Sequence, residues 1–182
     1  MPPTLLRKGG GCMKLRSVAA RVATYGLLIA LAFVFSYLES LLPLNFGIPG
    51  IKLGLGNLVV LLTMALLSRR EALIVAAVRI VLVGFTFGNP YSMLYALCGG
   101  LLSFAVMALL WNSRKLSVLG ISMAGAVAHN IGQLLFAAAV TETVRLWWYL
   151  PVLLVSATVT GALIGVAALV TLRRLPLYKS NI

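Results

Sequence analysis

Residues 150–172, LPVLLVSATVTGALIGVAALVTL, run for 23 positions without a charged side chain, and they decide the fold class of this chain. About 20 apolar residues in an α-helix cross the hydrocarbon core of a bilayer. This stretch is long enough and apolar enough to do so. It therefore predicts a transmembrane helix.

The composition of the whole chain points the same way. Of its 182 residues, 62% are apolar and only 10% are charged, and the mean hydropathy is +1.07. Soluble domains average about 25% charged residues and roughly half apolar ones. These values exclude a soluble globular fold, a disordered chain and a disulfide scaffold. We therefore predict an all-α integral membrane protein.

The acidic residues are too few for most catalytic chemistry. Fifteen Lys and Arg face three carboxylates, Glu39, Glu71 and Glu142, and the chain has no Asp. The chain therefore has too few carboxylates for a catalytic carboxylate pair or for a carboxylate-bound magnesium site. Cys12 and Cys98, the only two thiols, do not form the ligand cluster that zinc needs. We expect no catalytic residues, no metal and no cofactor.

Five more apolar stretches precede residues 150–172, so the sequence predicts a six-helix bundle. The expected spans are 22–42, 51 or 58 to 67, 72–87, 91–111, 118–140 and 150–172. Polar or Gly/Pro-rich segments separate them, including a tight polar turn expected at 68–71. The resulting division of the chain is a basic cytoplasmic tail (1–21), a six-helix membrane domain (22–172) and a second basic tail (173–182).

The basic residues follow the positive-inside rule for these spans. With a cytoplasmic N-terminus, only Lys52 and Arg145 fall on outer loops, while Arg79 lies within a span. The cytoplasmic segments hold the other twelve, Arg7, Lys8, Lys14, Arg16, Arg21, Arg69, Arg70, Arg114, Lys115, Arg173, Arg174 and Lys179. Both termini are therefore predicted inside. Because the positive charges are distributed as topology signals, we expect no binding of nucleic acid.

Arg79 is the first candidate for a functional site. It lies about eight residues into a short span, where an unpaired guanidinium costs at least ~2.5 kcal/mol. It must therefore face a partner or a watery cavity. One hypothesis is a structural pair with Glu39, the only carboxylate within a span; the other is that Arg79 binds an anionic ligand.

Further polar groups lie where hydrocarbon is expected. In the fifth span Gly125, His129 and Gln133 recur at four-residue intervals, which places them on one helix face, and Asn130 lies beside them. The stretch 49–57, PGIKLGLGN, is either an ordinary outer turn or irregular backbone that lines a cavity. The candidate ligand-binding residues are Glu39, Lys52, Asn57, Arg79, Asn89, His129, Asn130 and Gln133.

Three spans carry small residues at close helical spacing, the pattern by which membrane helices approach each other closely. The stripes are Ala19, Ala23, Gly26 and Ala30 in the first span; Gly120, Ala124, Ala128 and Gly132 in the fifth; and Ala157, Gly161, Gly165 and Ala168 in the sixth. Each stripe serves either internal packing or contact with another membrane protein. The first is the candidate partner interface.

Three segments resemble a known family. IPGIKLGLGNLVVLL (48–62), FGNPYSMLYALCGGLLS (87–103) and GAVAHNIGQL (125–134) are similar to the Gx transporter family of bacterial membrane proteins, also labelled heptaprenyl diphosphate synthase component I. That family in turn is similar to the six-helix S components of energy-coupling factor (ECF) transporters. The resemblance implies a multi-pass protein of the bacterial inner membrane. It also implies capture of a small vitamin- or cofactor-like molecule from outside, together with a membrane T subunit and paired ATPases.

The resemblance leaves three functions open. The residues favour a substrate-binding transport subunit whose ligand is anionic, and the first stripe resembles the alanine motif by which S components meet the T subunit, with Gly26 replacing one alanine. The family label suggests instead a membrane partner in polyprenyl diphosphate synthesis. Such a partner would be noncatalytic, because trans-prenyl synthases resemble one another through Asp-rich motifs that this chain lacks. A third possibility is an assembly factor for a membrane flavin or quinone redox system.

The charge distribution generates a topology prediction. Reporter fusions after Arg114 and after the C-terminus should behave as cytoplasmic, and a fusion after Thr141 as external, because Lys and Arg near span ends are retained inside. Paired alkaline phosphatase and fluorescent-protein fusions measure this. A C-terminal fusion with external activity would overturn the six-span count.

Overall fold

The computed structural model describes residues 18–41, 54–113 and 116–174, and these ranges are helical throughout apart from short connections. The all-α prediction is therefore confirmed. The elements are α1 (Val18–Leu41), α2 (Leu55–Leu66), α3 (Arg69–Thr86), α4 (Pro90–Ser113), α5 (Val118–Thr141), the 3₁₀ helix η2 (Val144–Tyr149) and α6 (Leu150–Arg174).

Two helix starts differ from the sequence prediction. The helix α1 begins at Val18, so residues 18–21 are helical although they were assigned to the basic tail. The polar turn expected at 68–71 is also wrong, because α3 already begins at Arg69. The Ser68 hydroxyl accepts a hydrogen bond from the Glu71 backbone N–H at 3.5 Å, which caps the helix and lets it start inside the polar stretch.

Four stretches are long and apolar enough to cross a membrane, namely Val18–Leu41, Pro90–Trp111, Val118–Thr141 and Arg145–Arg174. The helix α2 has 12 residues and is therefore only about 18 Å long. Four charged residues in α3, including Arg79, reduce its apolar character. The chain is thus a multi-pass membrane protein with four candidate spans.

The short helix α2 lies in the interior of the protein. Gly56 and the whole run from Val59 to Met64 are buried. The helix packs against α1, α3 and α6. Its backbone is therefore shielded by protein, the condition under which a short element is tolerated at membrane depth.

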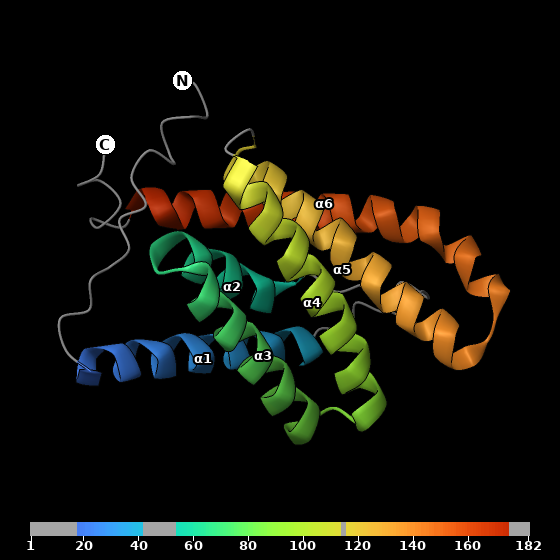
Figure 1. The fold of residues 1–182 in the computed structure, drawn as a ribbon, viewed down its shortest axis with the longest axis horizontal. Helices are drawn as coiled ribbons and strands as arrows, with labels where there is room; N and C mark the ends of the chain where they lie inside the picture. The colour runs from blue at the N-terminus through green and yellow to red at the C-terminus, as the bar shows by residue number, and fades with distance from the viewer. Residues whose placement is uncertain (1–17, 42–53, 114–115, 175–182) are drawn as a thin grey trace.

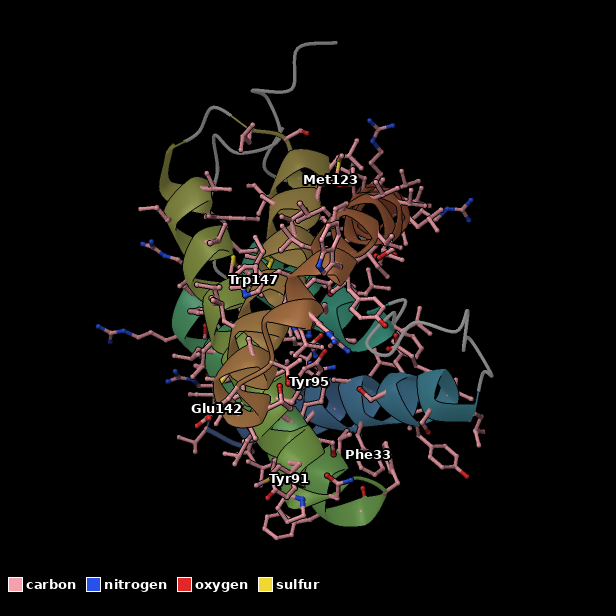
Figure 2. All side chains as sticks on the ribbon, turned by 90° about the vertical axis from the view of Figure 1, so that its right-hand side faces the viewer. Phe33, Tyr91, Tyr95, Met123, Glu142 and Trp147 are labelled. Carbon is pink, nitrogen blue, oxygen red and sulfur yellow. The ribbon has the colours of Figure 1, made fainter. Side chains whose placement is uncertain are left out.

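The remaining helices present apolar side chains outward. Leu27, Phe85 and Leu109 are each more than two-thirds exposed. Figure 2 shows that the side chains projecting from the ribbon are mostly carbon. Extended apolar surface of this kind is rare on soluble monomers and typical of contact with lipid or a membrane partner.

The helix α5 packs closely against both α4 and α6 (Figure 1). A Cβ added to Gly132 would lie 2.9 Å from the Cys98 carbonyl oxygen, and one added to Gly161 would lie 2.8 Å from the Cα of Met123. The Ser122 hydroxyl also donates to the Gly161 carbonyl at 2.8 Å. The small residues of α5 and α6 at these points therefore serve internal packing.

The stripe on α1 behaves differently. Ala19, Ala23, Gly26 and Ala30 are all exposed. A Cβ added to Gly26 would meet nothing within 4 Å. No described part of the chain packs on this stripe, so internal packing does not explain it.

This difference predicts contrasting effects of one methyl group. Gly161→Ala should lower the free energy of unfolding by about 1–3 kcal/mol, because the new Cβ meets the backbone of α5. The matched variant Gly26→Ala should be neutral or stabilising, since alanine favours helix and the space is open. Thermal unfolding in detergent measures both. Equal losses would contradict the packing described here.

Candidate functional site

Glu39 joins the C-terminal part of α1 to the beginning of α2. Its two carboxylate oxygens accept hydrogen bonds from the backbone N–H groups of Gly54 at 2.6 Å and Leu55 at 3.2 Å. The first N–H groups of a helix have no partner within the helix and lie at its positive end, so a carboxylate is stabilised there. Gly54 adopts a φ of 78°, a conformation that glycine reaches without steric cost.

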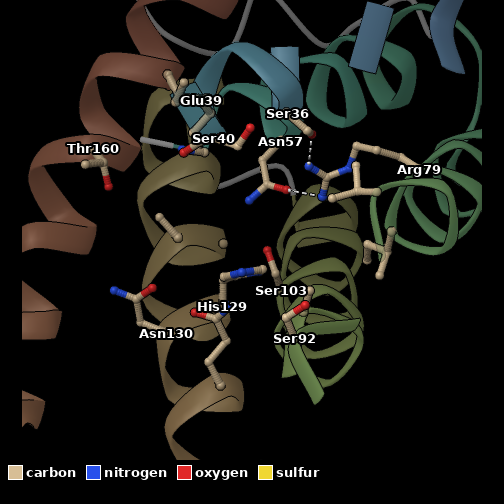
Figure 3. Close-up of a pocket in the computed structure, with 18 of the residues that line it drawn as sticks. Ser36, Glu39, Ser40, Asn57, Arg79, Ser92, Ser103, His129, Asn130 and Thr160 are labelled. Carbon is tan, nitrogen blue, oxygen red and sulfur yellow. Dashed lines mark hydrogen bonds between the residues drawn. The ribbon is translucent and has the colours of Figure 1, made fainter. Parts of the chain in front are cut away.

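Arg79 reaches from α3 to both α1 and α2. Its Nη1 donates to the Ser36 hydroxyl at 3.1 Å and its Nη2 donates to the Asn57 side-chain oxygen at 3.2 Å (Figure 3). The buried Nε has no hydrogen-bond partner. Both of these acceptors are neutral, and Glu39 acts on the guanidinium through space, without a hydrogen bond to it.

The two charges therefore do not form the direct pair that the sequence left open. Among the described residues, Arg79 bonds to Ser36 and Asn57, while Glu39 bonds to the backbone of α2. The Glu39 carboxylate is bound by the N–H groups at the positive end of α2 and not by Arg79. Of the two hypotheses for Arg79, a structural ion pair with Glu39 is not what the geometry shows.

Gly56 creates the space that the guanidinium occupies. A Cβ at this position would overlap Nη1 of Arg79 and would lie 2.7 Å from the Ser36 hydroxyl. A glycine in the first turn of α2 therefore lets a charged side chain pass against the backbone. This is one physical reason for the glycine-rich pattern that precedes α2.

A second polar wall comes from α5. Gln133 is buried, and a Cβ on Gly99 of α4 would lie 2.6 Å from its Cγ and 2.8 Å from the His129 carbonyl oxygen. Gly99 thus lets α4 approach the polar face of α5. The Asn130 amide donates to the Leu153 carbonyl at 3.0 Å, so this side chain also ties α5 to α6.

These walls enclose a cavity of about 410 Å³, lined by residues of all six α-helices. Figure 3 shows Arg79, Asn57 and Ser36 on one side and His129 and Asn130 on the α5 wall. Seven of the eight predicted site residues line it, namely Glu39, Asn57, Arg79, Asn89, His129, Asn130 and Gln133. Lys52 lies outside the described residues. That these groups bind a ligand stays a prediction.

Asn89 also has a local structural role. Its side-chain oxygen accepts from the Ser92 N–H at 2.7 Å, and the Ser92 hydroxyl accepts from the Asn89 N–H at 2.9 Å. This reciprocal pair caps the start of α4, with Pro90 at the first helical position. Asn89 therefore shapes the rim of the cavity through the backbone.

Sequence reasoning missed the hydroxyl groups of the cavity. Those that line it are Ser36, Ser40, Ser92, Ser103, Ser122 and Thr160. Serine and threonine are ordinary in membrane helices, where they bond to their own backbone or across helix contacts. Only Ser36 had a detectable signal, because its three-residue spacing from Glu39 places both on one face of α1.

A family model described as heptaprenyl diphosphate synthase component I matches residues 28–171, which include all six α-helices in whole or in large part. No curated protein and no solved structure matches the chain significantly.

Proposed function

The chain belongs to the heptaprenyl diphosphate synthase component I family, and from this premise we propose that it is the substrate-binding membrane subunit of a transporter, similar to ECF S components. In this role it captures a small anionic, vitamin- or cofactor-like molecule from outside the bacterial inner membrane. The observation that carries the proposal is that Arg79 lines this cavity and donates its hydrogen bonds there to two neutral acceptors.

The charge balance of the cavity favours an anionic ligand. Arg79 and Glu39 are the charged side chains among its described lining residues. The carboxylate is already bound by two N–H groups at the positive end of α2, whereas the guanidinium donates its hydrogen bonds to two neutral acceptors. A desolvated cation attracts an anion far more strongly than a cation in water does. A carboxylate or phosphate group suits this position.

The volume of the cavity favours a small ligand. About 410 Å³ lies near the lower end of the range for small-molecule sites.

We propose that all six helices cross the membrane with both termini inside. Tyr25, in the first half of α1, donates to Glu71 at the start of α3 at 2.9 Å, while Glu39 near the end of α1 caps the start of α2. Thus α2 runs opposite to α1, and α3 runs with it, as alternating spans require. The burial of α2 supports this arrangement despite its short length.

In that topology the cavity faces outward. Its exposed lining residues are Ser40, Phe87, Gly88 and Asn89, at the end of α1 and between α3 and α4. Both positions belong to the outer side if the N-terminus is inside. The opening therefore supports capture of the ligand from outside.

The family description favours a second candidate, a noncatalytic membrane partner in polyprenyl diphosphate synthesis. In that case Arg79 would hold the diphosphate head. The two functions differ in what copurifies with the protein, which is a small water-soluble anion in the first case and a prenyl diphosphate in the second. Mass spectrometry of extracts from the purified protein separates them.

The ligand prediction concerns Arg79. Arg79→Gln should weaken binding of the copurifying molecule by about tenfold to a hundredfold, because it removes a charge-assisted hydrogen-bond donor. Arg145→Gln is the matched control, since Arg145 is exposed and does not line the cavity. Quantitative mass spectrometry on the monodisperse fraction measures the bound ligand. Equal ligand content in both variants would contradict the role of Arg79.

We propose further that the exposed stripe on α1 contacts an ECF T subunit, which works with paired ATPases. All four residues, Ala19, Ala23, Gly26 and Ala30, are exposed and lack a partner within the described chain. Small residues in this pattern allow the close helix contact that membrane complexes use. The resemblance of the stripe to the alanine motif supports the same assignment.

Bulk on the stripe should block this contact. Ala23→Trp should abolish copurification with a coexpressed T subunit and its ATPases while ligand content stays the same, because a close helix contact tolerates no added volume. Val22→Trp is the control, since Val22 is exposed beside the stripe. Retention of the complex by Ala23→Trp would show that the stripe faces lipid.

A further inference from the structure

The outer part of α1 already makes contacts of the kind that an anion would make in the cavity. Ser36 and Glu39 lie on one face of α1 and both line the cavity. Ser36 accepts from Arg79 Nη1 at 3.1 Å, and Glu39 accepts from the N–H groups of Gly54 and Leu55. A guanidinium together with free N–H groups at a helix start is the usual donor set for a carboxylate or phosphate.

We propose that Ser36 and Glu39 act as internal competitors for the ligand, so that an anion bound at Arg79 and the start of α2 displaces this face of α1. The proposal rests on the proposed function, because it requires an anionic ligand in this cavity. Glu39 has the same chemistry as a ligand carboxylate. Two carboxylates cannot hold the same N–H groups, and their like charges repel at short distance.

The other attachments of α1 decide which part of the helix responds. Tyr25 bonds to Glu71, and Ala32 packs in a buried cluster with Val59 and Val75 of α2 and α3. These contacts hold the inner and middle parts of α1 independently of the ligand. Beyond Ala32, the polar bonds from α1 to other described segments of the chain are those of Ser36 and Glu39.

Aromatic contacts also attach this part of α1, since the ring centroids of Phe33 and Tyr37 each lie 5.6 Å from that of Phe87. Displacement therefore loosens the outer two turns of α1 and leaves its inner end attached. The same helix carries the exposed stripe with Gly26 and Ala30. Because these stripe residues precede Ala32, they lie in the part that stays attached, and ligand occupancy changes the position of the last two turns of α1.

Titration with inorganic phosphate tests the competition. The purified full-length protein is titrated at constant ionic strength, and binding is followed by calorimetry. Ser36→Ala should bind phosphate about fivefold more tightly than the unmodified chain, because Arg79 Nη1 loses its resident acceptor and no charge changes. Thr24→Val is the control, since the Thr24 hydroxyl bonds only to Ala20 of its own helix. Glu39→Gln should also bind more tightly.

A distance measurement reports the displacement itself. Spin labels at Leu38→Cys on α1 and Leu94→Cys on α4, both exposed positions, are placed in a Cys12→Ser, Cys98→Ser background. Phosphate should shift and broaden the distance distribution. In Arg79→Gln it should leave the distribution unchanged.

The outcomes separate this inference from the proposed function. One outcome is that phosphate binds through Arg79, Ser36→Ala binds it no more tightly than the unmodified chain does, and the label distance stays fixed. This outcome overturns the competition and leaves the anion site in place. If phosphate binds neither the unmodified chain nor Ser36→Ala nor Glu39→Gln, both are overturned.

Discussion

A guanidinium placed among apolar helices must find acceptors, because each buried donor left without one costs about 1–3 kcal/mol. Arg79 meets this constraint in part, through one hydroxyl of α1 and one amide of α2, while its buried Nε has no hydrogen-bond partner. The bare backbone at Gly56 provides the space. Three helices are thereby fixed around a single charge, and the cavity lies where their polar groups converge.

The cavity is polarised because its two charged side chains, Arg79 and Glu39, do not pair directly with each other. A direct pair between Arg79 and Glu39 would have neutralised the site. The start of α2 instead supplies two N–H groups to the carboxylate, and neutral groups solvate the cation. The result is a polarised pocket in which the cation and the carboxylate have separate hydrogen-bond partners. This asymmetry links the fold to the proposed binding function.

Small residues have opposite uses in different parts of this chain. In α5 and α6, Gly132 and Gly161 bring neighbouring backbones into contact. On α1, the same kind of stripe faces outward with open space at Gly26. Close packing within α4–α6 makes that half of the molecule a firm wall. The C-terminal part of α1 is attached to its neighbours mainly by the hydrogen bonds of Ser36 and Glu39 and by aromatic contacts with Phe87.

Hydropathy and helix-breaking residues are local properties of the chain and need no knowledge of its packing. The sequence by itself therefore determined the all-α membrane class. It also predicted six helices whose observed starts and ends lie close to the predicted ones. It also identified Arg79, His129 and Gln133 as polar groups at membrane depth, and the structure places all three on one cavity. Only the tertiary structure decided that Glu39 caps α2 and that Ser36 holds Arg79. Those partners lie far apart in sequence, 43 residues in the case of Ser36 and Arg79. Which acceptor a buried charge uses depends on which helices become neighbours, and no local pattern contains that information.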